Sequence, residues 1–60
     1  MQRDEFWEQA YRLLMLAQAR LGNRAQALRT YARCVERLRE ELDVPPSAAT
    51  VRLFEELRVG

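Results

Sequence analysis

The feature that most constrains this chain is a short break at Gly22 and Asn23, between two helix-like patterns. Gly22 directly follows Leu21, the last apolar residue of the first pattern, and glycine adopts the left-handed conformation that ends a helix at little cost. Asn23 stands where its side-chain oxygen can cap a following helix. Gln26, three residues later, can reach back to the N–H of Asn23 and so complete a capping box. Because so short a link leaves little freedom, the sequence predicts two helices packed antiparallel.

Apolar spacing places a helix on each side of this hinge and a third near the end of the chain. The predicted helices cover residues 4–21, 24–42 and 47–58. Asp4 is the expected N-cap of the first helix, and Ser47 that of the third. Pro45 and Pro46 disfavour the α conformation in the residues before them, so the second helix should end just ahead of them. The predicted fold is all-α, an antiparallel helical hairpin with a third packing helix, in a single domain or domain fragment.

Length and composition exclude several classes of function. A chain of 60 residues buries only about 60% of the surface that its unfolded form exposes, so it depends on regular helix packing or on a partner. The single Cys34 forms no internal disulfide, and without histidine the chain lacks the commonest metal ligand and general base. We therefore predict no metal, no cofactor, no catalytic residue and no enzymatic activity. With no long apolar run and no secretory signal, the expected location is the cytoplasm, without membrane contact.

The first predicted helix carries more apolar surface than one partner helix covers. Its broad apolar sector consists of Phe6, Trp7, Ala10, Tyr11, Leu13, Leu14, Ala17 and Leu21. Met15 lies at the margin of this sector and Leu16 outside it. The second helix has a narrow seam formed by Leu28, Tyr31, Val35, Leu38 and Leu42. The first helix should therefore have neighbours on two sides, whereas the seam of the second is too short for a free-standing coiled coil.

The arginines gather in the middle of the chain, although the net charge is only +1. Residues 12–39 contain seven arginines and one glutamate, whereas both ends of the chain are acidic. The simpler interpretation is a solvated face that the acidic ends neutralise, and the alternative is a site for nucleic acid or an acidic partner. The residues of that alternative site are Arg20, Arg24, Arg29, Arg33 and Arg37.

Several short segments match a known pattern when they are read together. They are Leu13 to Ala17, Leu21-Gly22, Ala27-Leu28, Tyr31 and the break at Val44-Pro45-Pro46-Ser47. With these segments the chain resembles the bacterial transcriptional activator domain, a divergent branch of the tetratricopeptide repeats. That family occurs in antibiotic-pathway activators and in STAND-type signalling regulators. The chain departs from the pattern where Met15 replaces a small residue and where Gln18 and Arg24 replace tyrosines.

The resemblance implies a tetratricopeptide-like binding module in a transcriptional regulator, and the surplus of apolar surface agrees with it. Either neighbouring repeats cover this surface or copies of the chain associate through it, and we expect association. The expected interface consists of Trp7, Tyr11, Met15, Leu16 and Gln18. Nucleic-acid binding by the arginines is the alternative function, and it would weaken steeply with salt. Against it, so short a hinge favours an antiparallel hairpin over a helix-turn-helix.

Overall fold

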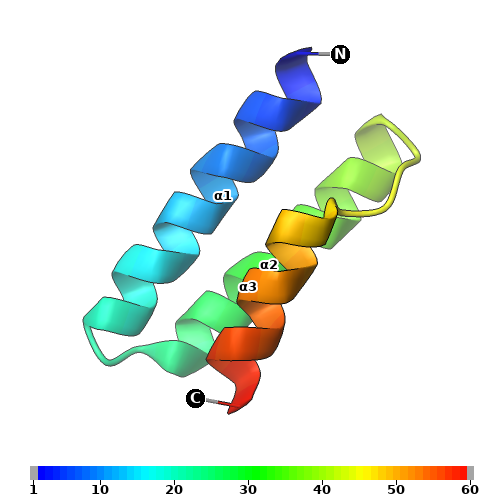
Figure 1. Cartoon of the computed structure of the whole chain (residues 1–60). Coiled ribbons are helices and arrows are strands. Elements are labelled where there is room, and N and C mark those ends of the chain that lie inside the picture. Colours follow the sequence, from blue (N-terminus) through cyan, green and yellow to red (C-terminus); the bar gives the residue numbers. More distant parts are fainter. Residues whose placement is uncertain (1, 60) are drawn as a thin grey trace.

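The computed structural model describes the backbone of residues 2–59 and the side chains of residues 7–59. This part of the chain contains three helices and no strand: α1 (Gln2–Arg20), α2 (Arg24–Glu41) and α3 (Ala48–Val59). Figure 1 shows α1 and α2 as an antiparallel hairpin, with α3 running back alongside α2. The predicted all-α fold, a helical hairpin with a third packing helix, is confirmed.

The helix bounds differ slightly from the expected ones. α1 begins at Gln2, two residues before the expected start, so Asp4 lies within the helix and is not its N-cap. The side chains of Asp4 and Phe6 lie outside the described residues. Every other helix end falls within one residue of the expected position.

The hinge has the hydrogen bonds of a Schellman motif, which ends a helix through a left-handed residue. Gly22 has a φ of 80°, and its N–H donates to the carbonyl oxygen of Ala19 at 3.0 Å. The N–H of Asn23 donates to the carbonyl oxygen of Gln18 at 2.9 Å. These bonds satisfy two carbonyl groups at the end of α1, so the predicted left-handed glycine is confirmed.

The capping box predicted at the start of α2 is wrong. Asn23 precedes the helix, but its side chain makes no capping hydrogen bond. Gln26 does not reach back to Asn23, because its Oε1 accepts a hydrogen bond from Arg29 at 3.0 Å. α2 therefore begins with backbone bonding alone, from the N–H of Ala27 to the carbonyl oxygen of Asn23 at 3.1 Å.

The core lies where the three helices meet. Its fully or almost fully buried side chains are Met15, Ala27, Thr30, Cys34, Leu38 and Thr50. The rings of Tyr31 and Phe54 stack between α2 and α3, with centroids 4.1 Å apart and planes 15° apart. Aromatic stacking adds roughly 0.5–1.5 kcal/mol to the burial of two large rings, so this pair helps to anchor α3 on α2. None of the described helices combines the length and the apolarity that crossing a lipid bilayer requires.

Candidate protein interface

Helix α1 turns one side toward α2 and α3 and leaves another side uncovered. Its inward side, hereafter the inner face, consists of the buried or half-buried residues Glu8, Tyr11, Arg12, Met15, Gln18 and Ala19. Its opposite side, hereafter the outer face, consists of the exposed residues Ala10, Leu13, Leu14, Ala17 and Leu21. Leu13 is 62% exposed and Leu21 83% exposed. The exposed apolar side chains of α1 thus gather on the outer face, with Arg20, seven residues after Leu13, at its edge, whereas the inner face contains most of the polar side chains.

Three hydrogen bonds explain why polar side chains lie on the inner face. A carboxylate oxygen of Glu8 accepts a hydrogen bond from the backbone N–H of Ser47 at 2.7 Å. Nη1 of Arg12 donates to the hydroxyl of Thr50 at 2.8 Å. The hydroxyl of Thr30 donates to Oε1 of Gln18 at 2.7 Å. No buried side-chain nitrogen or oxygen within residues 7–59 lacks a partner. Because every such group is satisfied, the inner face avoids the penalty of burying free polar atoms.

Glu8 also completes the N-terminus of α3. The N–H of Val51 donates to the carbonyl oxygen of Ser47 at 3.0 Å, which places Ser47 at the N-cap. In a capping box, a glutamate three residues after the N-cap accepts the N-cap N–H, but Thr50 stands there instead. Glu8 supplies that carboxylate from α1, and its charge is favourable beside the positive end of the α3 dipole. Sequence reasoning missed this role, because Glu8 and Ser47 are 39 residues apart.

The structure does not bring together the five residues expected to form the interface. Met15 is completely buried, so it is unavailable to a partner, and this part of the prediction is wrong. Gln18 is half-buried and bonded to Thr30. The reason is angular: successive residues of a helix point about 100° apart, so Met15 faces the core while the preceding Leu14 faces solvent. The other three residues are Trp7 and Tyr11, both half-buried, and Leu16, which is exposed outside the outer face.

Trp7 and Tyr11 lie at the rim between α1 and α2. The guanidinium carbon of Arg37 lies 5.2 Å from the centroid of the Trp7 ring, in a cation–π contact. Trp7, Tyr11 and Arg37 share a shallow hollow with Ala10, the first residue of the outer face. Trp7 is thus partly covered within the molecule and borders the outer face.

All five arginines of the alternative site are exposed, but they form two groups. Arg29, Arg33 and Arg37 follow one another every four residues along α2, whereas Arg20 and Arg24 flank the hinge. None of the five forms an ion pair with a residue in the described part of the chain, where the ion pair present joins Arg58 to Glu55 at 2.6 Å. Arg33 and Arg37 share a hollow with acidic side chains, those of Glu36 and Glu40. The basic charge is therefore interrupted rather than continuous.

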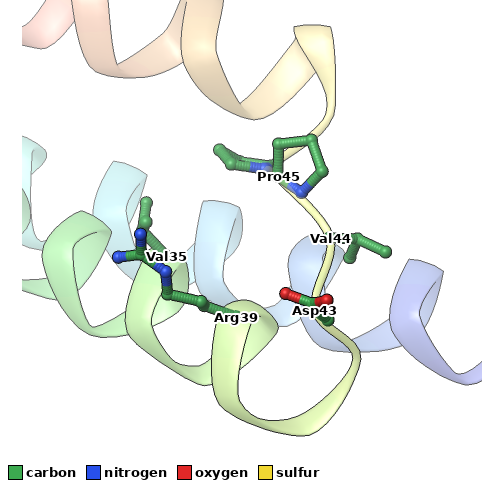
Figure 2. A pocket seen from close by; sticks show the side chains of 6 residues that line it. Val35, Arg39, Asp43, Val44 and Pro45 are labelled. Carbon is green, nitrogen blue, oxygen red and sulfur yellow. The ribbon is translucent and has the colours of Figure 1, made fainter.

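Another hollow, with a volume of about 360 Å³, lies beside the loop between α2 and α3. Its lining residues are Val35, Arg39, Asp43, Val44, Pro45 and Pro46. Figure 2 shows Val35 and Arg39 on α2, with Pro45 on the loop across from them. Asp43 has a φ of 55°, and its N–H donates to the carbonyl oxygen of Arg39 at 3.1 Å, which ends α2 in a left-handed cap. The hollow is thus a by-product of how α2 ends and how the prolines turn the chain.

Among residues 7–59, the pKa values of Cys34, which is buried, and of Tyr31, which is half-buried, are shifted. Burial, with a smaller contribution from the Glu8 charge, raises the pKa of the Cys34 thiol to about 11. Burial also raises the pKa of Tyr31, and the nearby acidic groups add to this effect. A thiol with so high a pKa is almost entirely protonated near neutral pH, and the thiolate is the nucleophilic form. Cys34 therefore acts as a small apolar core residue. Residues 7–59 contain no cluster of three His, Cys, Asp or Glu side chains arranged to hold a metal ion.

The family comparison agrees with this geometry. The family model of the bacterial transcriptional activator domain matches residues 1–58, nearly the whole chain. No curated protein and no solved structure matches the chain. The match covers the hinge, the proline break and α3 together, so it confirms the resemblance stated from the sequence. The chain belongs to the bacterial transcriptional activator domain family.

Proposed function

We propose that this chain is a protein-interaction module of a cytoplasmic transcriptional regulator, without catalytic activity of its own, and that it contacts its partner through the outer face. The observation that carries the proposal is the row of exposed leucines on that face, Leu13, Leu14 and Leu21. Contiguous exposed apolar side chains are unusual on a soluble monomer and common at interfaces. Fully burying one leucine contributes about 1.5–3 kcal/mol, so covering this row supplies a substantial driving force for association.

The residue types on the outer face indicate what kind of partner surface can pack against it. The five residues of the outer face are apolar and the nearest exposed charge, that of Arg20, lies at its edge, so a charged group placed against the middle of the face would lose hydration without gaining an ion pair. Ala10 and Ala17 are small and allow another helix to approach closely. A helix with an apolar face is therefore the partner that fits, and it can belong to a neighbouring helical repeat or to another copy of the chain.

Nucleic-acid binding by the arginines has less support. The row of Arg29, Arg33 and Arg37 is exposed, which such binding requires. However, Glu36 and Glu40 lie beside the row, and their charges would repel phosphates. Arg37 is also engaged with the Trp7 ring. For these reasons we favour a protein partner.

A transcription reporter in bacterial cells tests the proposed function. The chain is fused to an unrelated DNA-binding domain, and reporter output is compared for the native sequence, Leu14→Glu, Leu21→Glu and Leu16→Glu. Leu16→Glu is the matched control, because it adds the same charge to the same helix at an exposed leucine outside the outer face. We expect the two outer-face variants to lose activation and the control to keep it. Equal output from all four fusions would refute an interaction through the outer face, and circular dichroism of each purified chain checks that the helices remain folded.

A further inference from the structure

The proposed function does not identify the partner helix. The pattern of large and small residues on the outer face indicates which partner fits. Ala10, Leu14, Ala17 and Leu21 follow one another in steps of four, three and four residues, so they form one stripe along the helix. Large and small side chains alternate along this stripe. Resting on the proposed function, we infer that the partner is a second copy of this chain, bound so that the two α1 helices run antiparallel.

The alternation is self-complementary in only one of the two possible directions. In a twofold-symmetric pair, residue i of one copy contacts residue j of the other, and j contacts i. When the helices are antiparallel, Leu14 lies opposite the partner's Ala17 and Leu21 opposite the partner's Ala10. Every leucine of the stripe then meets an alanine at all four levels, and such interdigitation avoids voids. A parallel pair would instead place leucine against leucine and alanine against alanine, so that crowded and empty levels would alternate.

The distribution of charge favours the same direction. The exposed charges nearest the C-terminal end of the stripe are those of Arg20 and Arg24, whereas near the other end of α1 the sequence carries Arg3, Asp4 and Glu5, with a net charge of −1. An antiparallel pair brings the basic end of one helix toward the acidic end of the other, and it also opposes the two helix dipoles. In this register the partner's Glu5 lies about 9 Å from Arg20 along the axis and the partner's Arg20 about 13 Å away. With a Debye length of roughly 8 Å in physiological salt, the attraction is weak and the repulsion weaker still. A parallel pair would place these arginines side by side.

The size of the stripe sets the strength of the expected dimer. Residues 10 to 21 of a helix span about 18 Å. One helix face of this length is smaller than the roughly 800 Å² per partner that stable complexes bury. We therefore expect a weak dimer, whose dissociation constant lies near 100 µM, about 5.5 kcal/mol of binding free energy.

Sedimentation velocity of the 60-residue chain tests the association. We expect the mean mass to rise from one chain toward two as the concentration increases from about 20 µM to about 1 mM. Leu14→Glu should weaken dimerisation at least about tenfold, because it places one carboxylate of each copy inside the contact. Leu16→Glu should leave it unchanged, although Leu16 and Leu14 have similar exposures of 39% and 47%. A native chain that stays monomeric at about 1 mM would overturn the inference.

Disulfide trapping tests the direction. Ala10→Cys chains and Leu21→Cys chains are mixed in oxidising buffer, in which the native Cys34 stays inaccessible because it is fully buried. An antiparallel pair yields the mixed dimer. It yields no Ala10→Cys homodimer, since these positions would lie about 16 Å apart along the axis, too far for a disulfide. A dominant Ala10→Cys homodimer would refute the antiparallel arrangement.

The two proposals fail in different ways. A monomeric native chain combined with reporter loss in Leu14→Glu would refute the second copy as partner and keep the outer face as a docking surface. A dimer that Leu14→Glu dissociates without changing reporter output would support the second copy and refute the role of the face in transcription.

Discussion

The inner and outer faces of α1 reverse the usual relation between polarity and burial. The inner face buries the carboxylate of Glu8 and half-buries Arg12 and Gln18, and all three side chains are hydrogen-bonded. The outer face leaves Leu13, Leu14 and Leu21 exposed. Figure 1 shows why only one side is covered, since α2 and α3 lie together on the same side of α1. The orientation of α1 is therefore set by hydrogen-bond partners on α2 and α3 as well as by hydrophobicity.

Paired polar groups stabilise the inner face about as much as apolar burial does. A hydrogen bond to a charged group contributes about 1.5–3 kcal/mol net, which is comparable to burying one leucine. The inner face can thus outweigh the outer face without being more apolar, because Met15 adds buried apolar surface to its polar contacts. An apolar face left uncovered in this way remains available to another helix, which is the arrangement that repeat proteins use when they stack.

The largest predicted effect separates two adjacent residues of α1, Met15 and Leu14. Met15→Ala should lower the free energy of unfolding by about 3 kcal/mol, because it removes a fully buried side chain and leaves a cavity. Leu14→Ala should lower it by less than about 0.5 kcal/mol, because Leu14 is almost half exposed. Urea unfolding at low micromolar concentration, where the chain is expected to be monomeric, measures both. Equal losses would mean that the two faces do not differ in burial.

A smaller effect is expected at the polar end of the inner face. Glu8→Ala should destabilise the chain by about 2 kcal/mol, because it leaves the N–H of Ser47 without its acceptor and removes a charge from the N-terminus of α3. Glu8→Gln is the matched control, since its amide oxygen can still accept that hydrogen bond. We expect Glu8→Gln to recover at least half of the loss in a thermal unfolding experiment. If Glu8→Gln were as damaging as Glu8→Ala, the charge and not the hydrogen bond would hold α3.

Local signals in the sequence were sufficient for much of this fold. Gly22 and the two prolines act on their immediate neighbours, so the hinge and the end of α2 were predictable from short segments. The breadth of the apolar sector on α1 also indicated, correctly, that α2 and α3 would not cover all of it. The predicted capping box at Asn23 was wrong, because the side chain of Gln26 accepts a hydrogen bond from Arg29 on the same helix.

The sequence could not show which part of α1 would face inward. That choice depends on contacts between residues far apart in the chain, such as Arg12 with Thr50, 38 residues away. We expected Trp7 and Met15 in the interface because their side chains are large. That expectation gave too little weight to the direction in which each residue points around the helix axis. A sharper signal was present in the regular stripe of alanine and leucine from Ala10 to Leu21, which contains no polar residue to bond with another helix.

The smallest predicted effect concerns a polar pair on the inner face, and it tests whether these polar side chains are needed for stability. Thr30→Val removes the hydroxyl that donates to Gln18, so it leaves a partly buried amide oxygen unbonded and should cost about 1 kcal/mol. Adding Gln18→Leu removes the second member of the pair and replaces it with an apolar side chain of similar size. The double variant should regain most of that stability, because neither polar group is then left without a partner. A double-mutant cycle by urea unfolding measures the coupling. If the double variant were no more stable than Thr30→Val, the hydrogen bond itself would contribute to stability at this position. If it recovered, the loss in Thr30→Val would come from the unpaired amide of Gln18, and the polar groups of the inner face would be tolerated because they are paired.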